Sequence, residues 1–94
     1  RMRPNAHLIN TARGTLIDTK ALVKALKNNW FAGAGLDVFE HEPTIDPALL
    51  TLDNVTLLPH LGSATEETRR AMGLRVIDNI KAFFSGQTPR DLIC

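Results

Sequence analysis

The chain has 94 residues, of which 44% are hydrophobic and 22% are charged, as is usual for one small globular domain. Its 11 lysines and arginines nearly balance its 10 aspartates and glutamates, so the charge gives no sign of a nucleic-acid or anionic-membrane partner. The single cysteine, Cys94, excludes an intramolecular disulfide and suits a reducing compartment, so we expect a cytoplasmic protein. No apolar run approaches the roughly 20 residues that span a bilayer, and Met2 is not followed by a secretory leader, so we expect the sequence to begin within a longer protein.

The first predicted elements are a strand and a helix. A short apolar run after a Pro-Asn turn predicts a buried strand over His7–Thr11, which Arg13 and Gly14 end. Asp18 is a suitable N-cap for a helix that runs to about Asn28. The residues at helical spacing, which we expect on the buried face, are Leu22, Val23, Leu26 and Trp30.

A second strand is predicted over Ala32–Val38. Gly33 and Gly35 weaken a strand unless another backbone or a ligand approaches closely. A polar loop follows over Phe39–Asp46, and a short helical turn is predicted over Pro47–Leu50.

The last predicted elements are a third strand over Val55–Leu58 and a long helix. Ser63-Ala64-Thr65-Glu66 has the capping-box pattern, with Ser63 as N-cap and Glu66 reaching back to it. Gly86 is the expected C-cap, and Pro89 prevents the helix from continuing. The helix carries an apolar stripe, expected to pack in a core or between domains, of Met72, Val76, Ile80 and Phe83 or Phe84.

The order of these elements predicts the fold class. Strands that alternate with helices indicate an α/β fold with a parallel sheet. The predicted elements amount to about half of a doubly wound fold. A parallel sheet buries both of its faces, so this sheet needs packing partners that the chain does not contain.

Three sequence blocks together resemble one known family. They are Asn10-Thr11-Ala12-Arg13-Gly14, then residues 35–43 (Gly-Leu-Asp-Val-Phe-Glu-His-Glu-Pro), then residues 59–65 (Pro-His-Leu-Gly-Ser-Ala-Thr). In this order they resemble the D-isomer-specific 2-hydroxyacid dehydrogenase family over nearly the whole chain. The resemblance implies a longer two-domain enzyme. Residues 1–64 would form the C-terminal half of its Rossmann-like NAD(P)-binding domain, and residues 65–94 the long helix and tail that return to the substrate domain.

Gly33-Ala34-Gly35 only superficially matches a phosphate-binding loop. It lacks the third glycine, lies in a predicted strand and precedes a loop rather than a helix. We therefore expect the pyrophosphate to bind upstream, while this segment contacts the nicotinamide and the substrate. The choice between NAD and NADP is not readable here, because the discriminating residue follows an upstream strand.

Reduction of a 2-keto acid needs a carboxylate clamp, a polarised carbonyl and a proton. Arg13 follows a predicted strand, where ligands bind in open α/β sheets, and its planar guanidinium suits the first two tasks. His60 also follows a strand and suits proton donation. The resemblance pairs it with Glu42, since a carboxylate beside a histidine favours the imidazolium and fixes its tautomer. The alternatives are a surface Arg13, a His60 bonded to a backbone carbonyl, and a solvated Glu42 with Glu40 as near neighbour.

The resemblance also implies contacts with the nicotinamide. The residues concerned are Thr11, Ala12, Arg13, Asp37, His60 and Gly62. Asp37 would accept the carboxamide hydrogens, or else serve as a cap or turn residue. Gly62 would leave room for the ring, or else simply form a turn. His7 and His41 match no catalytic position, so we expect structural or solvent-facing roles for both, and we expect no metal site.

The favoured function is hydride transfer between NADH or NADPH and a small 2-keto acid, in either direction. Glyoxylate and hydroxypyruvate reductases fit best, because of the residues after His60 and the short tail. A phosphoglycerate dehydrogenase with a regulatory extension fits less well, and formate dehydrogenases lack a Glu42 equivalent. Corepressors with this fold resemble these enzymes and can keep the same three residues, so a nucleotide-sensing interaction protein is the alternative. We expect a homodimer as the full-length protein and an inactive isolated segment.

Overall fold

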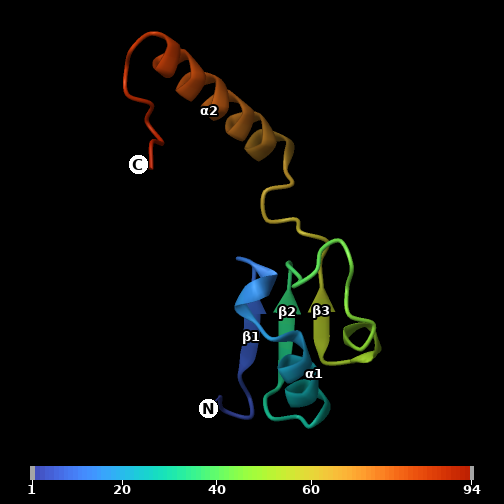
Figure 1. Cartoon of the computed structure of the whole chain (residues 1–94). Helices are drawn as coiled ribbons and strands as arrows, with labels where there is room; N and C mark the ends of the chain where they lie inside the picture. The colour runs from blue at the N-terminus through green and yellow to red at the C-terminus, as the bar shows by residue number, and fades with distance from the viewer. Residues whose placement is uncertain (1, 94) are drawn as a thin grey trace. The chain divides into compact units, whose positions relative to one another are not determined.

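The computed structural model describes residues 2–93, and the chain divides into two compact units, Arg1–Gly62 and Ser63–Cys94. The second unit contains α2 (Glu66–Phe84). The first unit contains the other elements, which Figure 1 shows in chain order. They are β1 (His7–Asn10), the 3-10 helix η1 (Gly14–Leu16), α1 (Thr19–Lys27), β2 (Gly33–Leu36), the 3-10 helix η2 (Leu49–Thr51) and β3 (Val55–Leu57).

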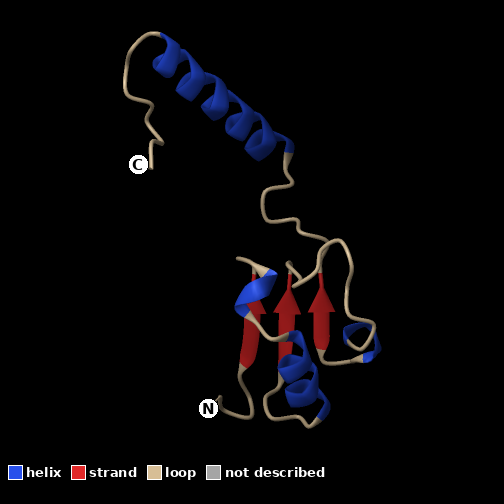
Figure 2. Cartoon of the chain, viewed as in Figure 1, coloured by secondary structure: helices blue, strands red, loops and turns tan. Residues whose placement is uncertain are grey.

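Three parallel strands form the sheet of the first unit, in the order β1-β2-β3 (Figure 2). Their carboxyl ends are level, because Asn10 pairs with Leu36, and Leu36 in turn pairs with Leu57. The residues that follow the three strands therefore emerge at the same edge of the sheet. The α/β fold with a parallel sheet that the sequence predicts is confirmed, with strands somewhat shorter than expected.

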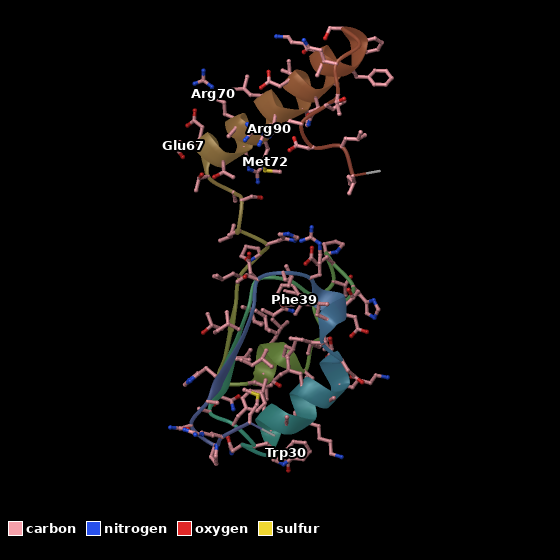
Figure 3. All side chains as sticks on the ribbon, turned by 90° about the vertical axis from the view of Figure 1, so that its left-hand side faces the viewer. Trp30, Phe39, Glu67, Arg70, Met72 and Arg90 are labelled. Atoms are coloured by element: carbon pink, nitrogen blue, oxygen red, sulfur yellow. The ribbon has the colours of Figure 1, made fainter. Side chains whose placement is uncertain are left out.

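Helix α1 and η2 pack on one face of this sheet (Figure 3). Asp18 is the N-cap of α1, as predicted, and its carboxylate accepts the N–H of Ala21 at 2.9 Å. The core beneath the two helices contains Leu22, Val23, Ala25, Leu26, Phe31, Ala34, Leu36 and Leu49. The short helix η2 begins later than the predicted turn at Pro47, because the Asp46 carboxylate accepts the N–H of Ala48 at 2.8 Å and holds the chain in a turn there.

Trp30 does not belong to the buried face of α1, contrary to the prediction. The helix ends at Lys27, and Asn29 has a left-handed backbone with φ of 51° that redirects the chain. Trp30 is consequently 55% exposed, and Phe31 enters the core in its place. The prediction extended the helical spacing to Trp30, but this spacing applies only within the helix, which ends at Lys27.

The opposite face of the sheet is left open by the described residues of the first unit. Ile9 is 68% exposed there, and Asn10 is the only buried residue of β1. The prediction of a buried first strand is therefore wrong for this unit, because α1 and η2 cover one face only. In β2, a Cβ atom at Gly33 would lie 2.6 Å from the carbonyl oxygen of Asn54, so this glycine permits a close backbone approach.

Helix α2 begins two residues later than predicted. Its N-cap is Thr65, whose hydroxyl accepts the N–H of Thr68 at 3.2 Å, whereas Ser63 lies in the preceding turn. The predicted capping box of Ser63 and Glu66 is therefore wrong. Threonine offers the same capping oxygen as serine, and a start at residue 66 places Glu66 and Glu67 in the first turn, where carboxylates suit the helix dipole.

The end of α2 follows the prediction. Gly86 adopts a φ of 74° just after the C-cap Ser85, with its N–H bonded to Phe83 O at 3.1 Å. The N–H of Gln87 bonds to Ala82 O at 2.9 Å, which completes a Schellman motif. The residues of the predicted apolar stripe are each at least half exposed within the second unit: Met72, Val76, Ile80, Phe83 and Phe84. No helix within residues 2–93 combines the length and apolar character needed to cross a membrane.

Candidate functional site

Three of the predicted site residues follow the carboxyl ends of the three strands. Arg13 comes three residues after β1, Asp37 directly after β2, and His60 three residues after β3. Because the strand ends are level, all three residues lie at one edge of the sheet. This is the edge at which open α/β sheets bind ligands.

His60 and Glu42 meet at this edge from two different loops. The distance from His60 Nδ1 to Glu42 Oε2 is 2.7 Å, and Glu42 Oε1 accepts the N–H of Phe39 at 2.9 Å. An ionised carboxylate only accepts hydrogen bonds, so the proton lies on Nδ1. The ring nitrogen Nε2 takes no part in this bond. Spacing along the sequence could not establish this pairing, which the fold brings about.

The neighbours of Glu42 hold its carboxyl in the ionised form. The hydrogen bond from His60 lowers the pKa of Glu42 most, and the bond from the N–H of Phe39 lowers that pKa further. The positive charge of Arg13 acts in the same direction. The side chains of His60 and Glu42 are 47% and 34% exposed, so a small ligand can reach the pair.

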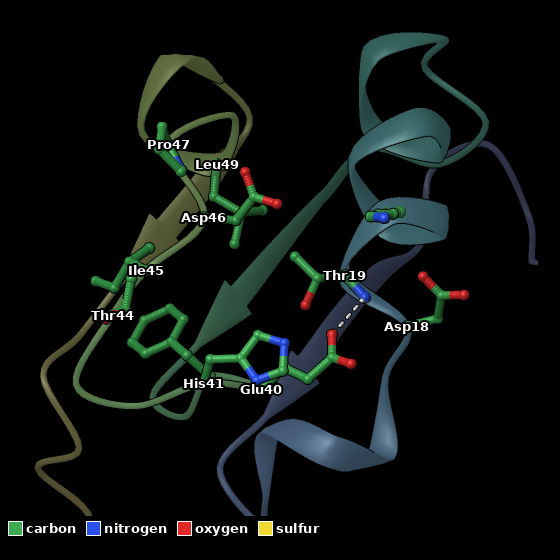
Figure 4. A pocket seen from close by; sticks show the side chains of 11 residues that line it. Asp18, Thr19, Glu40, His41, Thr44, Ile45, Asp46, Pro47 and Leu49 are labelled. Carbon is green, nitrogen blue, oxygen red and sulfur yellow. Dashed lines mark hydrogen bonds between the residues drawn. The ribbon is translucent and has the colours of Figure 1, made fainter.

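Glu40, the near neighbour of Glu42 in sequence, points to a different part of the unit. Its Oε2 accepts the N–H of Thr19 at 3.3 Å, at the start of α1 (Figure 4). There it borders a hollow of about 440 Å³ that His41 and Asp46 also line, and to which Glu42 and the predicted cofactor-binding residues do not contribute. From the sequence alone, either Glu40 or Glu42 could pair with His60. In the structure Glu42 pairs with His60, whereas Glu40 bonds to Thr19.

Asn10 organises the loop that carries Arg13. Its buried side chain donates from Nδ2 to Arg13 O at 2.9 Å, and its Oδ1 accepts the N–H of Ala12 at 3.1 Å. The exposed guanidinium of Arg13 donates to Ala12 O at 2.6 Å. Asn10 is not among the predicted site residues, although an asparagine between a strand and a turn is the signal for such a local arrangement.

Gly14 allows the Arg13 loop to contact the loop after β2. A Cβ atom at residue 14 would lie 1.9 Å from the carbonyl carbon of Phe39 and 2.4 Å from the nitrogen of Glu40. No side chain fits between these two backbones. The contact joins the segment of Arg13 to the segment that leads into Glu42.

Asp37 is buried at the end of β2, with 4% of its surface exposed. Its Oδ1 accepts the N–H of Leu61 at 2.7 Å, and its Oδ2 accepts the N–H of Gly62 at 2.8 Å. His60, just before these residues, has a φ of 56°, in the left-handed region. Sequence reasoning missed these bonds, because they join residues more than twenty positions apart.

The other predicted cofactor residues lie around the open face of the sheet. Thr11 and Asp37 border a hollow of about 350 Å³ on this face, and His7 lines it as well. Ala12 and Gly62 are exposed at the nearby strand ends. Within residues 2–93, no three metal-ligating side chains gather into a group that could hold an ion.

Known proteins resemble this chain over most of its length. Residues 1–62 match the family model of the "D-isomer specific 2-hydroxyacid dehydrogenase, NAD binding domain". The chain is 55% identical over 92 residues to a glyoxylate reductase of Thermococcus litoralis, covering 98% of this chain and 28% of that protein. It is 48% identical over 94 residues to glyoxylate/hydroxypyruvate reductase B of Enterobacter agglomerans, covering 99% of this chain and 29% of that one. The chain thus spans somewhat more than a quarter of these relatives.

A solved structure agrees with these matches. It is the NADPH-dependent glyoxylate/hydroxypyruvate reductase of Sinorhizobium meliloti, in complex with NADP and malonate. Its sequence is 56% identical and its TM-score is 0.85, over 87% of this chain and 26% of that one.

Proposed function

This chain belongs to the D-isomer specific 2-hydroxyacid dehydrogenase family, and we propose that the enzyme containing it transfers a hydride between NADH or NADPH and a small 2-keto acid. Glyoxylate and hydroxypyruvate are the proposed substrates, since the relatives are named for them. Residues 1–64 would belong to the nucleotide-binding domain, and residues 65–94 to the helix and tail that return to the substrate domain. The exposed apolar stripe of α2 is suited to packing against that domain or a second subunit.

The bond between His60 Nδ1 and Glu42 Oε2 is the observation that carries this proposal. The ionised Glu42 holds the Nδ1 proton and thereby orients the ring, so that Nε2 delivers a second proton. A nicotinamide held at this edge would supply the hydride for the carbonyl carbon of the substrate. His60 protonates the carbonyl oxygen in the same reaction, a contribution typically worth about 10² to 10⁴ in rate.

Arg13 is proposed to clamp the substrate carboxylate and polarise its carbonyl group. A guanidinium stays charged at any working pH and presents two parallel donors to a carboxylate. Its charge also stabilises the negative charge that develops on the carbonyl oxygen. The exposure of Arg13 at the sheet edge supports this role, since its guanidinium is accessible to a ligand.

We place the nicotinamide at the carboxyl edge of the sheet, where Thr11 follows β1 and Asp37 follows β2. A carboxylate has lone pairs beyond the two that Asp37 uses, so this residue can also accept a carboxamide hydrogen. We propose that the nicotinamide is contacted by Thr11, Ala12, Arg13, Asp37, His60 and Gly62. The phosphates must bind elsewhere, because Gly33 and Gly35 lie in a strand.

Separate Arg13→Gln and His60→Gln substitutions in the full-length protein test this function. The measurement is NADH- or NADPH-dependent reduction of glyoxylate and hydroxypyruvate. We expect kcat/KM to fall by about 10² to 10⁴ for His60→Gln, since the general acid is removed. His41→Gln is the matched control, because His41 is an exposed histidine of the neighbouring loop and should leave turnover unchanged. Full turnover in both variants would contradict the proposal and favour a nucleotide-sensing interaction protein.

A further inference from the structure

We infer that Asp37 is a positioning residue that fixes His60 by binding the backbone immediately after it. The significance for catalysis rests on the proposed function, in which His60 donates the proton. The hydrogen bonding of Asp37 to this loop does not depend on that function. Experiments can therefore contradict the inference without contradicting the proposed function, and the reverse.

Both carboxylate oxygens of Asp37 are engaged by the loop that follows β3. They accept the N–H groups of Leu61 and Gly62 at 2.7 and 2.8 Å. A carboxylate as deeply buried as Asp37, at 4% exposure, is unfavourable unless charged hydrogen bonds compensate for the lost water. Any other path of the loop would leave this charge unpaired, so the two bonds select one conformation of residues 60–62.

The selected conformation is one that histidine rarely adopts on its own. His60 has a φ of 56°, and such backbones persist only where the surroundings stabilise them. Two successive N–H groups that converge on one anion supply this stabilisation. Since they follow His60 directly, they fix the backbone from which the imidazole projects.

The side chain and the backbone of His60 are thus held from different elements. Glu42 holds Nδ1 of the ring, while Asp37 holds the following peptide groups. Asp37 itself is anchored in the sheet, because its N–H donates to Asn10 O at 3.0 Å. Without the bonds from Leu61 and Gly62 to Asp37, the loop that carries His60 would be mobile. The orientation of the imidazole, and with it the position of Nε2, would then no longer be fixed.

The unmodified full-length protein offers a first test through amide hydrogen exchange. Leu61 is 48% exposed, and an exposed loop without hydrogen bonds exchanges rapidly. We expect the N–H groups of Leu61 and Gly62 to exchange at least tenfold more slowly than an unstructured peptide. Exchange at the unstructured rate would overturn the inference.

Asp37→Asn in the full-length protein provides the second test. Asparagine keeps the shape, but its NH2 group cannot accept one of the two N–H groups and its oxygen is uncharged, so one bond is lost and the other is weakened. We expect about tenfold faster exchange at residues 60–64 without cofactor and about a tenfold fall in kcat. The KM for NADPH or NADH should rise as well, because Asp37 is also proposed to contact the nicotinamide, whereas a role limited to cofactor binding would raise KM and leave the exchange of the cofactor-free protein unchanged.

Asp18→Asn is the matched control. Its carboxylate also accepts a backbone N–H, that of Ala21, but it caps α1 rather than the loop of His60. This variant should loosen the start of α1 only and keep kcat. Unchanged exchange at residues 60–64 in Asp37→Asn would overturn the inference. Full turnover in Arg13→Gln and His60→Gln would instead overturn the proposed function, so the two failures are distinguished by different measurements.

Discussion

At the scale of single residues, Glu42 links the candidate site to pH. Its hydrogen bonds to His60 and to the N–H of Phe39 hold its pKa in the folded protein below the ordinary value of 4.5. A carboxyl group with a lowered pKa stabilises the fold fully above its unfolded pKa, and this contribution is lost as the pH falls through the folded pKa. The contribution of Glu42 should therefore persist at neutral pH and disappear only below about pH 4.5.

Glu42→Gln should reveal both the chemistry and this pH dependence. We expect kcat/KM to fall about tenfold or more, since the charged hydrogen bond to His60 is lost. The stability difference between the parent and the variant should shrink as the pH falls below 4.5, as measured by urea unfolding from pH 3 to 7. Glu40→Gln is the control for turnover, because Glu40 bonds to Thr19 instead. A stability difference that grows toward low pH would refute the assignment.

Gly14→Ala should disturb the site through the backbone. The added methyl group would overlap the carbonyl carbon of Phe39, so we expect a loss of about 1–3 kcal/mol in unfolding free energy, together with lower turnover. Gly73→Ala is the opposite case. Nothing lies within 4 Å of the Cβ position of Gly73 in α2, and alanine should stabilise that helix by about 0.5–1 kcal/mol. Urea unfolding of both variants of the full-length protein measures the contrast, and equal effects would argue against the close contact at Gly14.

At the scale of elements, sequence patterns predict the helices and strands that interactions between neighbouring residues determine. The Asp18 cap and the apolar spacing of α1 identified that helix, and the runs of apolar residues identified the three strands. The start of α2 was misplaced because Ser63 and Thr65 carry the same capping oxygen. The bonds of Asp37 escaped prediction for another reason, since Asp37 binds a loop that only the assembled sheet brings near.

Paired alanine substitutions distinguish the two candidate caps of α2. Thr65→Ala removes the oxygen that accepts the N–H of Thr68, so we expect a loss of about 1 kcal/mol in unfolding free energy. Ser63→Ala should stay within about 0.5 kcal/mol of the parent, because Ser63 lies in the preceding turn. Chemical denaturation of the full-length protein is the measurement. A larger loss from Ser63→Ala would reinstate the predicted capping box.

At the scale of the whole chain, exposed apolar side chains limit the stability of the fold. Ile9 on the open sheet face is 68% exposed, and Phe84 in α2 is 83% exposed. Each such side chain forgoes roughly 1.5–3 kcal/mol of burial that a covering element would supply. The predicted parallel sheet already implies that packing partners are missing, because such a sheet is normally covered on both faces.

The isolated chain of 94 residues should therefore lack a cooperative thermal transition. The apolar side chains that stay uncovered do not help to offset the conformational entropy of the ordered backbone. Scanning calorimetry checks this, with the full-length protein as the positive control. A sharp transition with an enthalpy of about 60–80 kcal/mol, as expected for a domain of this size, would contradict the prediction.

The level strand ends also determine where the chain tolerates insertions and deletions. One extra residue inside β1, β2 or β3 advances the chain by about 3.3 Å and turns every later side chain of that strand to the other face. Arg13, Asp37 or His60 would then leave the common edge. An extra residue at the exposed Asp53, ahead of β3, changes none of these positions. Members of the family should therefore vary in length at such turns, while the distance from each strand to its site residue stays fixed.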